Sequence, residues 1–334
     1  RTGMDTAYLG DDFMACVKAC VEHAKATGLL AWLYDEDRWP SGAAGGLVTA
    51  DPQYRARHLL FTSKPYGGHL QQGSGDSLAV GHRSENGRLL ACYQIRLEHG
   101  FLADYRRLAD GETTDPDATI WYAYLEIATP SPWFNHQTYV DTLNPAAIRR
   151  FIDITHERYA EVVGDQFGST IPAIFTDEPQ FTRKQPFRLS TGNEEVVFPF
   201  TDDLPDTYRA AYGDELLDHL PELFWELPDG QPSLTRYRYH DHVADRFTIA
   251  FADQIGACCE EHGIALTGHL MEESTLECQT HALGEAMRSY RALQIPGIDI
   301  LCDSREYTTA KQAQSAVHQY GRPGVLSELY GVTD

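Results

Sequence analysis

Short apolar runs that end in polar or acidic residues recur along this 334-residue chain. The six runs are LLAWLYDED (29–37), TIWYAYLEI (119–127), IPAIFTDEP (171–179), IALTGHLME (264–272), GIDILCDS (297–304) and GVLSELYG (324–331). Continuous apolar runs are typical of strands in a parallel sheet whose two faces are both covered by helices. The repeated pattern therefore predicts an α/β fold.

Helical periodicity between the runs supports this alternation. It predicts helices over 5–27, 145–163, 233–262, 281–293 and 307–320. The nucleotide-binding fingerprint GxGxxG is absent, which favours a (β/α)₈ TIM barrel over a doubly wound sheet. Because such a barrel has eight strands, we interpret the six runs as strands 2 to 7 of an apparently incomplete barrel. Residues 1–334 are thus expected to be the catalytic barrel fragment of a chain with further domains.

Two stretches interrupt the rhythm of strands and helices. Residues 62–118 are rich in Gly and Ser, and ENG at 85–87 is a hairpin signal between strand-like runs, so we expect a small inserted β-subdomain. Residues 180–232 contain Pro and acidic clusters without a clear period. We interpret this second stretch as an inserted loop region that lines the cleft.

The charge balance limits the classes of partner. The chain has 27 Lys+Arg against 49 Asp+Glu, a net charge of −22, and would repel phosphate backbones and anionic lipids. We expect no nucleic-acid partner, and no apolar run approaches the roughly 20 residues of a membrane helix. An acidic surface with 18 Tyr, 14 Phe and 5 Trp suits an oligosaccharide or polysaccharide substrate, although the charge also fits simple solubility.

Two glutamates at strand ends are the predicted catalytic residues. Glu178 follows the fourth predicted strand and Glu328 the seventh, so they would face each other across a barrel mouth. Hydrolysis of a glycosidic bond needs one carboxylic acid to protonate the leaving oxygen and one carboxylate to assist attack at the anomeric carbon. We assign Glu178 as general acid and Glu328 as general base or nucleophile, with Asp177 as a neighbour that tunes the acid.

Further residues at or beyond the strand ends are predicted to bind the substrate. Carboxylates and His can hydrogen-bond sugar hydroxyls, and aromatic rings can stack on the sugar. The predicted substrate-binding residues are Asp35, Glu36, Asp37, Trp39, Trp133, Asp177, His269, Glu272 and Tyr330. For the segment 34–46 the alternative is a structural loop that Arg–carboxylate pairs make rigid.

The metal content is open at this stage. His269 precedes two glutamates, but the chain has no HExxH motif or other tight ligand spacing, which disfavours zinc. Calcium is possible because its oxygen ligands can come from dispersed loops. The seven cysteines form no CxxC pair, and we interpret most of them as buried thiols.

Five segments together resemble a known family. WLYDEDRWPSGAAGG, YVDTLNPAAIRRFI, IFTDEP, LTGHLMEE and RPGVLSELYG are similar, in order and spacing, to the barrel of glycoside hydrolase family 106 and related α-L-rhamnosidase-like proteins. The resemblance implies an exo-acting, inverting α-L-rhamnosidase that acts on plant or microbial glycans, with calcium possible in its site. By motif, Glu178 matches the acid and Glu328 the base.

Three alternatives stay open. A retaining, β-galactosidase-like glycosidase of the same barrel type would use Glu328 as its nucleophile, and the separation of the two carboxyl groups distinguishes retention from inversion. A sugar-binding barrel without turnover would not need an acid at Glu178. A metal-dependent hydrolase would require further strand-end ligands to converge with His269.

Overall fold

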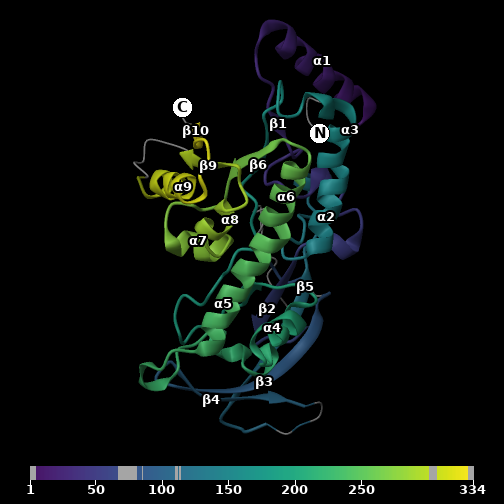
Figure 1. Cartoon of the computed structure of the whole chain (residues 1–334). Helices are drawn as coiled ribbons and strands as arrows, with labels where there is room; N and C mark the ends of the chain where they lie inside the picture. Colours follow the sequence, from purple (N-terminus) through teal and green to yellow (C-terminus); the bar gives the residue numbers. More distant parts are fainter. Residues whose placement is uncertain are drawn as a thin grey trace. The chain divides into compact units, whose positions relative to one another are not determined.

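The computed structural model describes residues 5–66, 81–84, 86–109, 112, 114–300 and 307–329 (Figure 1). The chain divides into two compact units. The first comprises Arg1–Arg55, Pro130–Phe181 and Ala244–Asp334, and the second comprises Ala56–Thr129 and Thr182–Val243. Each unit has its own five-stranded sheet and is described separately below.

The first unit contains an open parallel sheet with the strand order β1-β6-β8-β9-β10. Its strands are β1 (Leu33–Tyr34), β6 (Ala173–Asp177), β8 (Ala265–His269), β9 (Ile295–Ile300) and β10 (Leu326–Leu329). All four pairings are parallel, so the carboxyl ends of the five strands lie along one edge of the sheet. Five of the six apolar runs therefore form strands of one parallel sheet, as their sequence pattern predicts.

The prediction of a (β/α)₈ TIM barrel is wrong. Within the described residues the five parallel strands form a half-barrel, and a separate antiparallel sheet accompanies it. The remaining run, TIWYAYLEI, second in chain order, is the source of the error. It forms β5 (Thr119–Ile127), which pairs antiparallel with two strands of the second unit. An apolar run indicates a strand with two covered faces, but it does not say whether the neighbours are parallel.

Helices cover the parallel sheet of the first unit. They are α1 (Asp11–Thr27), α2 (Pro145–Ile154), α3 (His156–Val163), the end of α5 (Leu234–Phe247), α6 (Gln254–Glu261), α7 (Leu276–Ala282), α8 (Ala286–Tyr290) and α9 (Tyr307–Tyr320). A π-helical turn, Thr248–Asp253, joins α5 to α6. Helix α6 packs on β8, and α9 packs on β9. No helix in the described part of the chain has the length and apolar character needed to cross a bilayer.

The predicted helices agree well with this arrangement. The segment 307–320 is α9, and the predicted end near Gly28 is the left-handed C-cap of α1. Helix α2 buries Ile148, Phe151 and Ile152, the periodic apolar positions of the sequence. The stretch 145–163 nevertheless forms two helices, because the helical hydrogen-bond pattern is interrupted at Thr155, between α2 and α3.

The second unit is built on an antiparallel sheet with the order β4-β3-β5-β2-β7. Its elements are β2 (Arg57–Thr62), β3 (Arg88–Glu98), β4 (Phe101–Leu108), β5, β7 (Val196–Pro199), α4 (Leu204–Tyr212) and the first part of α5. The predicted insertions 62–118 and 180–232 supply β3, β4, β7 and α4. Residues 67–80 of the first insertion lie outside the described part.

Aromatic side chains form the core of the second unit. Phe61 stacks on Trp121 with ring centroids 5.1 Å apart and on Phe224 at 4.3 Å. Trp225 meets Trp121 edge-on, and its indole N–H donates to the carbonyl of Ser190 at 3.0 Å. Aromatic pairs in these geometries add to the stabilisation from burial itself. The packing of Trp121 in this core explains why β5 belongs to the second unit.

Close approach of strand backbones fixes the carboxyl end of β8. Gly268 pairs with Thr176 of β6 and has φ +135°, a backbone conformation that L side chains rarely adopt. A Cβ added to Gly268 would overlap the carbonyl oxygen of Thr176. Gly268 directly precedes His269, so this contact also sets where the His269 side chain begins.

We expect Gly268→Ala to lower the free energy of unfolding by about 3 kcal/mol or more, because it combines backbone strain with overlap against β6. The matched control is Gly28→Ala, where φ is +71° and an added Cβ meets no described atom within 4 Å. That control should lose only about 1 kcal/mol. Equilibrium urea denaturation measures both values, and equal losses would show that the overlap at Gly268 is relieved without cost.

Candidate active site at the carboxyl edge of the parallel sheet

Four predicted residues meet at the carboxyl edge of the parallel sheet. Asp177 ends β6 and Glu178 follows it, His269 ends β8, and Glu328 lies in β10. Asp177 pairs in register with His269, while Glu328 pairs with Asp299 of β9. In open α/β sheets, ligands bind outside the carboxyl ends of the strands. The location of this cluster is therefore that of a ligand site.

His269 is the centre of the cluster. Its side chain is 1% exposed, and its Nε2 lies 3.1 Å from a carboxylate oxygen of Glu328 and 3.5 Å from one of Asp177. Burial alone would lower the pKa of His269, but the hydrogen bond to Glu328 and the surrounding carboxylates outweigh it and raise the pKa to about 9. At neutral pH His269 is thus an imidazolium that donates from Nε2.

The pKa values of the two predicted catalytic glutamates move in opposite directions. Burial raises the pKa of Glu178 to about 7, against the opposing effects of His269 and of a hydrogen bond from Trp39. The hydrogen bond from His269 lowers the pKa of Glu328 below its ordinary value of 4.5. Near neutral pH the carboxyl group of Glu178 is therefore about half protonated, whereas that of Glu328 is ionised.

The backbone at Glu178 is held in an uncommon conformation. Its φ is +43°, in the left-handed region, and its N–H donates to the carbonyl of His269 at 3.2 Å. The indole N–H of Trp39 donates to the Glu178 carboxylate. Strained residues of this kind cluster at functional sites, where the surrounding contacts stabilise them. Glu272, which follows β8, also has a positive φ, +58°.

A buried carboxylate organises the loop that carries Trp39. The side chain of Glu36 accepts hydrogen bonds from the backbone N–H groups of Asp37, Gly42, Ala44 and Gly45, at distances from 2.6 to 2.9 Å. Burial still raises the pKa of Glu36 to about 7. The loop therefore wraps around this one side chain, which is only 3% exposed.

A second set of hydrogen bonds joins the loop to β6. Ser41 donates through its hydroxyl to Asp35 at 2.6 Å and accepts from the N–H of Asp177 at 2.8 Å. The N–H of Ser41 also donates to the carbonyl of Asp177 at 2.8 Å. Tyr34 donates its hydroxyl to the Asp177 carboxylate at 2.7 Å. Asp177 thus joins the loop to the site, and its pKa is raised, mainly by burial.

The predicted substrate-binding residues occupy different positions in this site. Asp35 and Glu36 point into the loop and are buried, whereas Trp133 is half exposed and donates from its indole to the carbonyl of Trp39 at 2.6 Å. Arg38 lies over the Trp133 ring, 5.5 Å from its centroid. Glu272 lies just beyond β8, and Tyr330 falls outside the described residues.

Sequence reasoning missed three residues of the site, Tyr34, Ser41 and Asp299, and considered Glu273 only as a possible metal ligand beside His269. Glu273 is buried and accepts from the Tyr290 hydroxyl at 2.7 Å and from the N–H of Leu270 at 2.9 Å. Asp299 has a carboxylate oxygen within 4.8 Å of the ligand atoms of His269 and Glu178. A usable signal was available for Asp299, because it is a charged residue inside the otherwise apolar first part of GIDILCDS (297–304).

The donor atoms of the cluster do not suit calcium. Two groups of three residues are compact, Asp177 with His269 and Glu328, and Glu178 with His269 and Asp299. Both groups share the imidazole of His269, whereas calcium takes six to eight oxygen ligands. Of the compact groups found among the described residues, none consists of oxygen donors alone. The compact groups of this cluster therefore do not fit the calcium ion that the family resemblance makes possible.

Comparisons with models of protein families, with curated proteins and with solved structures find no match to this chain. The assignment of a function therefore depends on the geometry and chemistry of the site.

The indole of Trp39 provides a direct test of the site's electrostatics. Because its hydrogen bond favours the ionised form of Glu178, we expect Trp39→Phe to raise the pKa of Glu178 above about 7. Carboxyl ¹³C NMR titration measures this pKa, with Glu178→Gln identifying the resonance. Trp32→Phe, an exposed tryptophan near β1, is the matched control and should leave the pKa unchanged. An unaltered pKa in Trp39→Phe would contradict the contact.

Proposed function

We propose that this chain is a glycoside hydrolase that uses Glu178 as its general acid and Glu328 as its general base. The observation that carries the proposal is the placement of two carboxyl groups around His269 in different surroundings. Glu328 lies 3.1 Å from the His269 Nε2 atom, whereas Glu178 is more buried and accepts from the Trp39 indole, and this difference moves their pKa values in opposite directions. A protonated carboxyl group can deliver a proton to the leaving oxygen, and an ionised carboxylate can activate water. Pairs of carboxyl groups whose environments separate their pKa values are the usual basis for such a division of roles.

The surroundings supply the other requirements of this chemistry. His269 holds Glu328 ionised at 3.1 Å, and Trp39 orients the Glu178 carboxyl group through its indole N–H. The half-exposed ring of Trp133, next to Trp39, has the Arg38 guanidinium over one face and can stack on a sugar ring with the other. A non-catalytic sugar-binding protein would need these aromatic rings but not a neutral carboxyl group beside an ionised one.

For the substrate, we propose an α-L-rhamnoside at the non-reducing end of a glycan, cleaved with inversion. This finer assignment depends on the sequence resemblance of the five motifs to the rhamnosidase-like family. In the alternative retaining mechanism Glu328 would attack the sugar directly. Proton NMR of the first-formed anomer distinguishes the two, because inversion releases the β-anomer from an α-rhamnoside.

The roles of the two glutamates predict that their variants will lose activity to different extents on substrates with different leaving groups. With an alkyl or unactivated aryl rhamnoside, we expect Glu178→Gln and Glu328→Gln each to lower kcat/KM by about 10²- to 10⁴-fold. With a dinitrophenyl rhamnoside, whose leaving group needs no proton, Glu178→Gln should recover most of its activity while Glu328→Gln should not.

Glu277→Gln, an exposed position in α7, is the control and should retain full activity on both substrates. Equal losses for Glu178→Gln on both substrates would reject its role as the acid. If the wild-type chain cleaves no aryl glycoside of any sugar, the proposed function is wrong.

The same pKa values predict the pH dependence of kcat/KM. Activity needs Glu178 protonated, so it should fall as pH rises through about 7. It also needs Glu328 ionised, so the acidic limb should lie below pH 4.5. Rates of Glu178→Gln on the dinitrophenyl substrate should lose the alkaline limb and keep the acidic one. Persistence of the alkaline limb in that variant would assign the limb to another group.

A further inference from the structure

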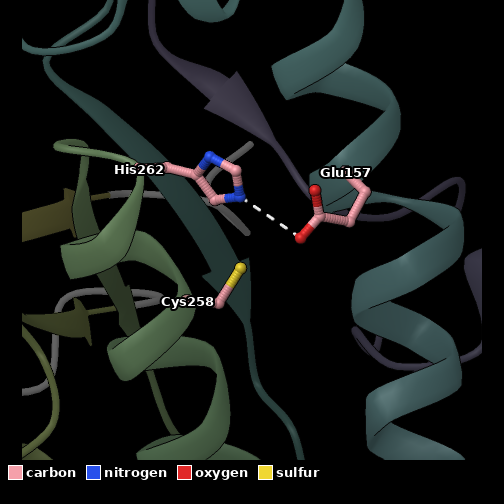
Figure 2. A group of neighbouring side chains, drawn as sticks. All are labelled: Glu157, Cys258 and His262. Carbon is pink, nitrogen blue, oxygen red and sulfur yellow. Dashed lines mark hydrogen bonds and ion pairs between the residues drawn. The ribbon is translucent and has the colours of Figure 1, made fainter.

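A second cluster of possible ligands lies at the opposite end of the parallel sheet. Cys258 and His262 are four residues apart, so they lie on one face at the carboxyl end of α6. Glu157 comes from the first turn of α3 and faces them (Figure 2). His262 precedes β8, whereas His269 ends it. The two clusters are therefore separated by the length of this strand.

The three side chains of this cluster point toward one another in Figure 2. The Nε2 atom of His262 lies 3.2 Å from a carboxylate oxygen of Glu157. One ligand atom from each of Glu157, Cys258 and His262 lies within 4.8 Å of the other two. With bond lengths of about 2.0 to 2.3 Å, tetrahedral zinc holds its ligand atoms roughly 3.3 to 3.8 Å apart. The three ligand atoms need to move only slightly closer together to reach this geometry.

A second observation in the same place points to a ligand. A cavity of about 10 Å³, lined by His156, Cys258 and His262 among others, adjoins the cluster. His156 is 5% exposed, and among the described residues neither of its ring nitrogens has a hydrogen-bond partner. The nearest charged partner of His156 is the Asp35 carboxylate, 3.9 Å from its Nε2 and beyond hydrogen-bond distance. Buried polar groups are normally hydrogen-bonded, so this imidazole beside a space about the size of one water molecule requires an explanation.

We propose that Glu157, Cys258 and His262 bind a zinc ion that links α3 to α6. Thiolate and imidazole ligands select zinc over calcium and magnesium, and a carboxylate commonly completes such a set. A water molecule occupies the fourth position of the zinc ion. This water also forms a hydrogen bond with a ring nitrogen of His156. Because the site lies at the amino end of β8, away from Glu178 and Glu328, it takes no part in the proposed hydrolysis.

The charges around Cys258 are mixed, two carboxylates and the Arg149 guanidinium, which hydrogen-bonds the thiol. Burial is the main reason that the pKa of this thiol is raised to about 11, and the carboxylates Glu157 and Glu261 add to the effect. Arg149 of α2 opposes it and favours the thiolate. Zinc binding must therefore release the thiol proton, and the affinity should fall as pH falls.

The test uses the complete chain, freed of metal by a chelator and titrated with Co²⁺ as the spectroscopic probe. We expect absorption bands of tetrahedral cobalt together with a sulfur-to-cobalt charge-transfer band, both displaced by Zn²⁺. Loss of a residue that only hydrogen-bonds to a metal ligand already weakens metal binding by about 10- to 100-fold. Removal of a ligand in Glu157→Gln or His262→Ala should therefore weaken zinc binding by at least about tenfold.

Cys258→Ser should abolish the charge-transfer band, and its fold is checked by circular dichroism. The matched controls are Glu161→Gln, one turn further along α3, and Cys20→Ser, an exposed cysteine of α1. Both controls should bind cobalt and zinc as the wild type does, and zinc should raise the Tm of the wild type but not of Cys258→Ser. Absence of binding, or binding without a sulfur band, would overturn the proposal. Neither result depends on glycosidase activity.

Discussion

The candidate active site depends on the interaction of the buried, positively charged His269 with Asp177 and Glu328. An ionised group without solvent is costly unless partners compensate it, and His269 is 1% exposed. Its partners come from two other strands, Asp177 on β6 and Glu328 on β10. Strands that are not neighbours in the sheet are thereby held in a fixed relation at their carboxyl ends. The approach of β8 to β6 at Gly268 makes this geometry possible.

The different states of the two glutamates follow from their surroundings and not from their residue type. Glu328 is partly exposed and receives a hydrogen bond from His269, so its ionised form is favoured. Glu178 is more buried than Glu328. The loss of contact with water favours its neutral form, and this effect outweighs the opposite effects of His269 and Trp39. One imidazolium thus serves both carboxyl groups, and the difference in solvation separates their pKa values.

Part of this arrangement could be predicted from the sequence. Five apolar runs are parallel strands, and the polar residues at their ends, including Asp177, Glu178 and His269, meet at one edge. The run 119–127 could not be assigned correctly, because a central antiparallel strand packed on aromatic rings is as continuously apolar as a parallel one. The sequence also could not predict where the side chains of Asp35 and Glu36 point, because this depends on how the backbone of the following loop folds around them.

The helix and strand from α6 to β8 relate the two proposed sites. His262 is the C-cap of α6, and β8 (Ala265–His269) begins three residues later and ends at His269. A parallel strand paired in register with β6 cannot slide without breaking its ladder, so a constraint at its amino end also limits its carboxyl end. A metal link between α6 and α3 would act on the end of the sheet opposite the carboxylates. It would favour the register that places His269 between Asp177 and Glu328, without contributing an atom to the reaction.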